Sequence, residues 1–192
     1  GNGRVEGLPS QFARAAARFA LGMGLASPGM HMIFQGEEFL ADNGFKWGNP
    51  STWDLDWIWR EPGPDKTKTA RDIARRKHFE FTKAAIILRK SSPAFDADAA
   101  ILRVYTHNEH GVLAFTRKKG GEEFLVIGSL HHEVWKNYLL SLPEGRWQEV
   151  FNSDAEIFGG SNVGNAGATV SGGQARLDIP SAGYLIFKKV GP

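Results

Sequence analysis

A Trp-rich stretch that also carries several carboxylates is the part of the sequence best suited to chemistry. Residues 36–59 read GEEFLADNGFKWGNPSTWDLDWIW, and four of the six Trp residues fall between Trp47 and Trp59. Flat aromatic rings stack against the C–H-rich faces of sugars, and carboxylates accept protons from sugar hydroxyls. The stretch predicts a carbohydrate-binding loop, while an aromatic lid over a neighbouring surface explains the local sequence equally well. The candidate substrate-binding residues are Glu38, Trp47, Trp53, Asp54, Asp56 and Trp57.

The carboxylates of this stretch do not form a catalytic pair by their spacing. Glu37 and Glu38 are consecutive, and consecutive side chains of an extended segment point in opposite directions. Asp54 and Asp56 lack the matching partner on another strand that two-carboxylate glycoside chemistry needs. The histidines lack the spacing of a zinc site, and residues 159–165 lack the Lys-Ser/Thr ending of a phosphate loop. We therefore assign no catalytic residue, no metal site and no cofactor to this chain.

The composition is that of an ordinary globular protein. Hydrophobic residues make up 42% and charged residues 23% of the 192 residues, and the formal net charge is +2. This balance gives no general attraction to nucleic acid or to an anionic membrane. No apolar run approaches the ~20 residues that span a bilayer, and the chain contains no cysteine. We expect a cytoplasmic protein whose partners are neither nucleic acid nor membrane.

The first half of the chain has helical periodicity on either side of one buried stretch. Ser10 is a candidate N-cap for a helix over residues 11–25, and a second helix is predicted over residues 65–90. Between them, Met30–Phe34 is nearly all apolar, which is typical of a strand buried on both faces of a parallel sheet. A lone parallel strand needs neighbours, so this α/β half is incomplete as a domain. Its unpaired edges also predict strand-mediated self-association.

From about residue 97 the pattern changes to short strands separated by glycine-rich turns. Regularly spaced strands of this kind are typical of an antiparallel β-sandwich with a core of its own. The predicted domains are therefore residues 1–96 and an all-β domain at residues 97–192. The predicted strands are Ile101–Thr106, Val112–Arg117, Glu123–Ser129, Asn137–Leu140, Trp147–Phe151, Gln174–Ile179 and Tyr184–Lys189, with turns that include residues 119–121, 143–145 and 171–173.

Several segments resemble sequences of a known enzyme family. Residues 34–39, FQGEEF, resemble the F-x-G-x-E-F that closes the last barrel strand in glycoside hydrolase family 13, the α-amylase family. Leu55-Asp56-Trp57 resembles the L-D-W that follows it in 1,4-α-glucan branching enzymes. Residues 151–165, FNSDAEIFGGSNVGN, closely resemble part of the C-terminal β-domain of the same enzymes, and residues 1–4 are similar to those just after the family's His-Asp motif. The matches extend over nearly the whole chain.

The resemblance implies the rear part of a (β/α)8-barrel enzyme: a helix, strand 8, a loop and a helix, followed by the antiparallel β-sandwich. The family's nucleophile Asp, acid/base Glu and transition-state-stabilising Asp would then lie upstream of Gly1, so the fragment alone is expected to be inactive. It implies a parent that cleaves an α-1,4-glucan linkage with retention and transfers the chain to a 6-hydroxyl, as in glycogen branching. The partners implied are an α-1,4-glucan or maltooligosaccharide and the missing upstream barrel.

Other interpretations stay open. Residues 45–50, FKWGNP, depart from the usual branching-enzyme sequence, so a trehalohydrolase or another hydrolase of the α-amylase family is the nearest enzymatic alternative. The chain could instead be a stand-alone glucan-binding module that uses its exposed aromatic rings. The rings considered for that role are Trp47, Trp53 and Trp57 in the loop and Trp135 and Trp147 in the β-domain.

Overall fold

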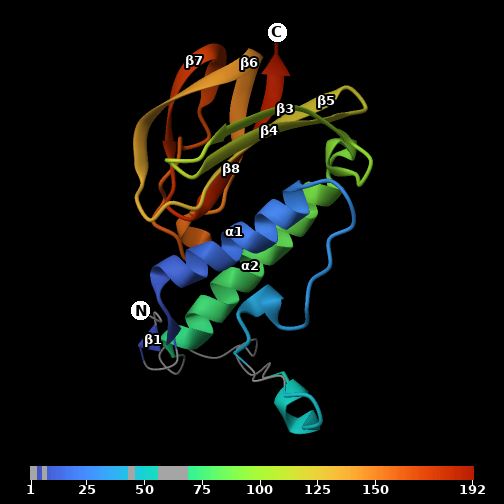
Figure 1. Ribbon diagram of the computed structural model, residues 1–192, viewed down its shortest axis with the longest axis vertical. Helices are drawn as coiled ribbons and strands as arrows, with labels where there is room; N and C mark the ends of the chain where they lie inside the picture. Colours follow the sequence, from blue (N-terminus) through green and yellow to red (C-terminus); the bar gives the residue numbers. More distant parts are fainter. Residues whose placement is uncertain (1–3, 6–7, 43–45, 56–68) are drawn as a thin grey trace.

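Two helices packed side by side against one face of an antiparallel sheet make up most of the chain (Figure 1). The computed structural model describes residues 4–5, 8–42, 46–55 and 69–192. A short antiparallel pair, β1 Arg4–Val5 and β2 Leu8–Pro9, precedes the first helix. A long connection separates the two helices, and the sheet follows the second.

Helix α1 covers Gln11–Ala26, which confirms the predicted range to within one residue. The Ser10 hydroxyl accepts a hydrogen bond from the backbone N–H of Ala13 at 3.1 Å. This bond satisfies one of the backbone donors that the first turn of a helix leaves unpaired. Pro28 lies two residues beyond the end, where its ring prevents the helix from continuing.

Helix α2 covers Ala70–Lys90 and begins with a capping box. The Thr69 hydroxyl accepts from the backbone N–H of Asp72 at 3.2 Å, and the Asp72 carboxylate accepts from the Thr69 N–H at 3.0 Å. This reciprocal pair fixes the first turn at Ala70. Residues 65–68, with which the predicted helix begins, lie outside the described residues.

The buried strand predicted at Met30–Phe34 is wrong for the chain as described. No strand forms there, and Met30 and Met32 are 98% and 85% exposed. A parallel strand is stabilised by hydrogen-bonded neighbours, and no described strand lies beside this segment. The described residues therefore contain the two helices of the expected barrel piece but not its strand. Self-association through this segment stays a prediction.

The second half forms an entirely antiparallel sheet with the strand order β3-β4-β5-β8-β6-β7. All seven predicted strands are found, because runs of β-branched and aromatic residues alternate with glycine-rich turns. The predicted sandwich of two sheets is instead one described sheet that curls until its ends face each other (Figure 1). The strands are β3 Ala100–His107, β4 Val112–Lys119, β5 Glu122–Ser129, β6 Trp135–Asn152, β7 Thr169–Ile179 and β8 Gly183–Gly191.

Strand β6 joins two of the predicted strands through a kink. Residues 143–145, predicted as a turn, lie inside β6, where its register against β7 shifts between Leu142 and Arg146. Gly145 has a φ of +118°, which glycine adopts without a steric penalty. On β7, a Cβ on Gly172 would lie 2.3 Å from the Pro143 carbonyl oxygen. Glycine on both strands permits the close approach, and the irregularity bends the sheet.

Two apolar cores result, one on each face of the sheet. The first fills the space between the helices and the sheet, and it brings Leu21 and Phe81 together with Tyr184. The second fills the inside of the curl, with Trp147 as its largest fully buried side chain. Because the first core takes side chains from both halves of the chain, the predicted domain boundary crosses a shared core.

Candidate functional site

The site predicted from the sequence lies on the connection between α1 and α2. The described part of this connection contains two 3-10 helices, η1 Glu37–Phe39 and η2 Pro50–Trp53. Figure 1 shows η1 beside α2, whereas η2 projects away from the helices and the sheet. Glu38 lies on η1, Trp47 and Trp53 lie before and at the end of η2, and Asp54 follows η2 directly. The two remaining candidates, Asp56 and Trp57, lie outside the described residues.

The Glu38 carboxylate holds the turn in which it sits. Its Oε2 accepts a hydrogen bond from the Gly36 backbone N–H at 2.7 Å, and the Glu38 carbonyl accepts from the Thr82 hydroxyl of α2 at 3.1 Å. The neighbouring Glu37 carboxylate likewise accepts from the Phe34 N–H at 3.1 Å. Gly36 has a φ of +92°, which suits a tight turn after an extended segment. Glu38 therefore stabilises the connection and fixes the direction in which the chain leaves the turn.

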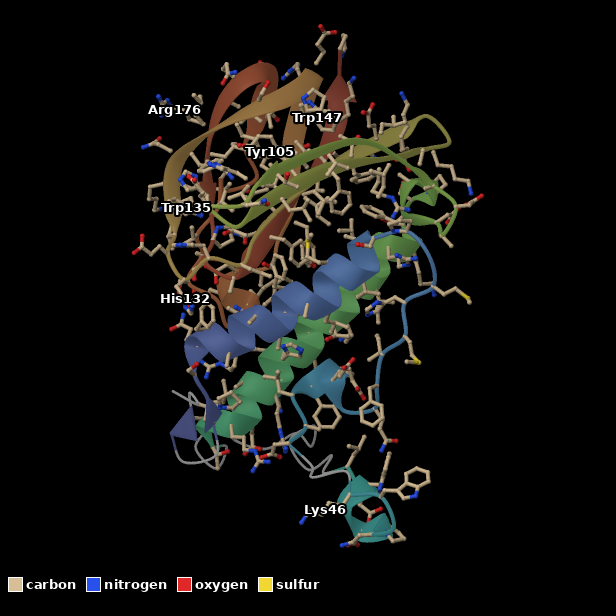
Figure 2. All side chains as sticks on the ribbon, in the orientation of Figure 1. Lys46, Tyr105, His132, Trp135, Trp147 and Arg176 are labelled. Carbon is tan, nitrogen blue, oxygen red and sulfur yellow. The ribbon has the colours of Figure 1, made fainter. Side chains whose placement is uncertain are left out.

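An aromatic group forms at the projecting end of the connection. The rings of Trp47 and Trp53 meet edge to face with centroids 6.4 Å apart, and Phe34 meets Trp53 in the same way at 6.1 Å. The Trp53 indole N–H donates to the Lys46 carbonyl at 3.2 Å, which fixes the ring against the backbone of Lys46. Figure 2 labels Lys46 at this projecting end. Trp47 is 94% exposed, so one broad aromatic face is available for stacking. The structure thus brings two predicted residues together and leaves Glu38 bonded to its own turn.

Asp42, which lies between η1 and η2 in the sequence, ties the connection to α2. The Asp42 carboxylate pairs with Arg71 and with Arg75, the latter at 3.1 Å. Arg75 is 2% exposed, and its guanidinium lies 5.8 Å from the centroid of the Phe39 ring. Nothing in the local sequence identifies Asp42 as the partner of Arg75, because the two residues lie 33 positions apart. This network carries the connection across the surface of α2.

A second cluster joins α1 to residues 151–165, which we call the joint loop. Arg18 of α1 is 2% exposed; its Nε donates to the Ser153 carbonyl at 2.8 Å and its Nη1 to the Phe158 carbonyl at 3.3 Å. The Asp154 carboxylate lies 3.6 Å from the Arg18 guanidinium. Burial lowers the pKa of Arg18, and the nearby Asp154 carboxylate acts against that shift. The segment with the most specific family resemblance therefore docks a helix onto the sheet.

Hydrogen bonds within the joint loop and to the end of β6 also brace it. Asp154 accepts from the Val163 N–H at 3.1 Å, and Glu149 accepts from the Asn165 N–H at 2.8 Å. A Cβ on Gly160 would lie 2.1 Å from the Asp154 carbonyl oxygen. Its 3-10 helix, η6 Glu156–Phe158, accepts a hydrogen bond from Lys77 of α2 at the Glu156 carbonyl at 3.1 Å. The polar residues of the segment have structural partners.

The two Trp residues suggested for sugar stacking in the β-domain differ in exposure. Trp147 is 0% exposed, and its indole N–H donates to the Pro143 carbonyl at 2.9 Å. A side chain enclosed in this way cannot stack on a sugar, so its suggested role as a binding residue is wrong. Trp135 is half-buried, with its ring centroid 4.5 Å from that of His110 and 4.8 Å from that of His131. Figure 2 labels both Trp residues.

Neither a metal-binding cluster nor a membrane-spanning helix is found in the part of the chain that the structure describes. No group of three or more His, Asp or Glu side chains there is arranged to hold a metal ion. None of the helices there is long and apolar enough to cross a membrane.

Known proteins match both the sequence and the fold. Residues 104–190 match the family model for the alpha amylase C-terminal all-beta domain. The 1,4-alpha-glucan branching enzyme GlgB of Agrobacterium fabrum is 33% identical over 169 residues, which cover 84% of this chain and 22% of that enzyme. The same enzyme of Nitrobacter winogradskyi is 32% identical over 200 residues, covering 96% of this chain and 25% of that enzyme. This chain thus spans a quarter or less of the length of these relatives.

Solved structures share the fold at lower sequence identity. The alpha-amylase of H. orenii has a TM-score of 0.57 and 18% identity, with 92% of this chain and 36% of that chain covered. The trehalulose synthase MutB of Pseudomonas mesoacidophila MX-45 has a TM-score of 0.58 and 20% identity, with 91% and 38% covered. The predicted resemblance is confirmed: this chain is similar to the C-terminal part of an α-amylase-family enzyme, and its relatives include 1,4-α-glucan branching enzymes.

Proposed function

We propose that the chain is the C-terminal part of a 1,4-α-glucan branching enzyme. The observation that carries this proposal is the 32% identity to a branching enzyme over 96% of the chain, which takes in both helices, most of their connection and the sheet. As the family resemblance implies, the proposed enzyme cleaves an α-1,4 linkage with retention and transfers the released chain to a 6-hydroxyl. The catalytic carboxylates belong to the barrel strands that precede this part.

In the proposed enzyme, residues 1–96 complete the (β/α)8 barrel and residues 97–192 cover it. The exposed Met30 and Met32 support this arrangement, because an apolar extended segment without sheet partners is stabilised once neighbouring strands pair with it. The sheet leaves this segment accessible, since its helix-side core packs on α1 and α2. The β-domain therefore stiffens the two helices from outside while the segment between them remains available to the barrel.

The connection between the helices provides the acceptor-side surface in this proposal. Trp47 offers an exposed ring, and Trp53 holds it edge to face. Glu38 positions the connection through its bond to the Gly36 N–H, and Asp54, Asp56 and Trp57 complete the proposed glucan contacts. Sugar hydroxyls pair with the carboxylates while the pyranose C–H face stacks on the indole.

The test is a chimera in which the upstream part of the Agrobacterium fabrum relative is joined to this chain. Incubation with amylose should raise the fraction of α-1,6 linkages, measured by proton NMR of the anomeric signals. Trp47→Ala should lower the rate of branch formation. Met30→Ala should lower the stability of the folded chimera but leave the rate of branch formation by the folded protein unchanged. A chimera that folds and only shortens amylose would overturn the branching proposal and favour an amylase-family hydrolase. Release of trehalose from maltooligosyltrehalose would identify the trehalohydrolase alternative.

A non-catalytic glucan-binding module is the second candidate, and the 94% exposure of Trp47 favours it. Calorimetric titration of the 192-residue chain with maltoheptaose, with cellohexaose as the comparison, tests it. Saturable binding of maltoheptaose alone that Trp47→Ala removes would support a module. Binding that is absent, or that Trp47→Ala leaves unchanged, would reject a module built on this ring.

A further inference from the structure

A cavity of about 260 Å³ lies where the N-terminal halves of α1 and α2 meet the joint loop. Arg14 and Arg18 line it from α1, Lys77 and His78 line it from α2, and residues 158–159 line it from the joint loop. Figure 1 shows the two helices side by side, both beginning at the end of the molecule near β1. The volume lies just below the range of about 300–1,000 Å³ that drug-sized ligands occupy, so the cavity suits a small ligand.

The described lining of this cavity contains three cationic side chains and no acidic one. Arg14 and Arg18 are four residues apart on α1, a spacing that places them on the same face of the helix. Arg14 and Lys77 each donate to a backbone carbonyl, at 2.6 and 3.1 Å. Among the ion pairs of the described residues, only Arg18 of the three has a carboxylate partner, Asp154 at 3.6 Å. The cavity wall is therefore positively charged.

The positive groups are close enough to repel one another. Burial lowers the pKa of Arg18; the Asp154 carboxylate opposes that shift, and Arg14 adds to it. Burial also lowers the pKa of Arg14. Like charges held close together in partly buried surroundings destabilise each other. An anion in the cavity would compensate for this repulsion.

A buried imidazole nitrogen in the cavity wall has no partner. His78 is 2% exposed, and its Nδ1 has no hydrogen-bond partner among the described residues. Buried polar atoms are nearly always satisfied in folded proteins, so this nitrogen indicates an occupant that forms hydrogen bonds. Burial and, after it, the charge of Arg18 lower the pKa of His78, and an anion beside the ring would act in the opposite direction. In the charged ring, and in one tautomer of the neutral ring, Nδ1 donates a hydrogen bond.

The lining favours a phosphate group over other small ligands. An apolar ligand would leave the cations and the imidazole unpaired, and a neutral sugar would not compensate the charge. A phosphate group accepts several charge-assisted hydrogen bonds at once from lysine and arginine side chains. The partial positive charge at the N-terminal ends of the two helices also favours an anion. Leu8, Leu40 and Ile73 add an apolar wall, against which a small carbon group attached to the phosphate would pack.

We infer that this cavity binds a phosphate group, as inorganic phosphate or as the phosphate monoester of a small molecule, between Arg14, Lys77 and the Nδ1 of His78. The inference is independent of the proposed branching activity, because it rests on the cavity, its charge and its unpaired nitrogen. A bound phosphate would touch both helices and the joint loop together. It should therefore tighten the attachment of α1 and α2 to the sheet.

The experiment is calorimetric titration of the 192-residue chain with inorganic phosphate and with glycerol 3-phosphate, in chloride buffer at constant ionic strength. Both should bind saturably and shift the amide signals of residues 74–78 and 158–159. Tighter binding of glycerol 3-phosphate would identify a monoester as the ligand, and equal or weaker binding would identify free phosphate. Lys77→Gln keeps a donor for the Glu156 carbonyl but removes the charge, so binding should weaken about tenfold or more. The matched control is Lys83→Gln, also on α2, where the exposed Lys83 pairs with Glu80 at 2.9 Å; it should leave binding unchanged.

Three results would overturn the inference. These are no saturable binding of either phosphate compound, amide shifts confined to residues outside the cavity, and equal effects of the two Lys substitutions. The shift map of the unaltered chain decides the question even where a variant folds poorly.

Discussion

Removal of the Arg18 side-chain charge should loosen the attachment of α1 to the sheet. Arg18→Met keeps most of the aliphatic packing but deprives the Ser153 and Phe158 carbonyls of their donor and leaves the Asp154 carboxylate without its ion pair. Loss of one partner of a buried pair costs about 3–5 kcal/mol. Asp154 retains the Val163 N–H, so we expect the lower end, about 3 kcal/mol. For a chain of this length that corresponds to a fall in Tm of about 6–12 °C.

Urea unfolding followed by circular dichroism measures this change. The matched control is Arg14→Met on the same helix, where the half-buried guanidinium donates to the nearby Pro9 carbonyl at 2.6 Å. The control should cost about 1 kcal/mol or less. If Arg18→Met is no more destabilising than Arg14→Met, the joint loop does not hold α1 in the way described. A double substitution with Asp154→Asn should show coupling of about 1 kcal/mol or more, because the two side chains share one network.

Three further predictions concern the cores and a buried histidine. Trp147→Ala should lower the free energy of unfolding by about 3–5 kcal/mol because the indole is fully enclosed; a cost below 1 kcal/mol in urea titration would refute that enclosure. Gly22→Ala should destabilise the chain even though alanine favours helices, because its Cβ would lie 2.2 Å from the Tyr184 hydroxyl oxygen; an unchanged Tm would show that the ring moves freely. Burial lowers the pKa of His78 from 6.5 to about 3, with nearby Arg18 acting in the same direction. Between pH 6.5 and pH 3 the imidazole of His78 is therefore protonated in the unfolded chain but not in the folded chain. The folding stability that is fully present above pH 6.5 is lost as the pH falls toward 3. Between pH 7.5 and 5.5 this loss is about 1.4 kcal/mol, and it should be absent from His78→Gln; identical pH dependence in both proteins would contradict the burial.

Local signals were sufficient to predict the regular elements. The Ser10 cap set the start of α1 to the residue, and each strand predicted after residue 97 was found because its alternation and its turns are encoded locally. The predicted boundaries of elements were wrong where one local sequence pattern is compatible with two structures. Pro143–Gly145 has the composition of a turn but serves as a kink, since Gly172 on the neighbouring strand allows the two backbones to approach.

Features that depend on distant partners could not be predicted. Met30–Phe34 has the composition of a buried strand, but a strand forms only where hydrogen-bonding neighbours exist. The burial of Arg75 depends on Asp42, 33 residues earlier in the chain. The cavity between β3, β4 and the first half of β6 depends on the curl of the whole sheet. Of the proposed glucan contacts, the exposure of Trp47 and its contact with Trp53 became visible only in three dimensions.

The shared core between the helices and the sheet limits how such proteins can be recombined. Phe81 of α2 contacts the rings of Phe151, Phe158 and Tyr184, all beyond residue 97. A crossover between related enzymes placed at residue 97 would pair helices from one parent with a sheet fitted to another. A crossover placed before α1 would take the helices, the joint loop and the sheet together from one parent, so that their shared core stays matched. We therefore expect functional hybrids of this family to have their junctions upstream of Gln11 rather than at the apparent border of the β-domain.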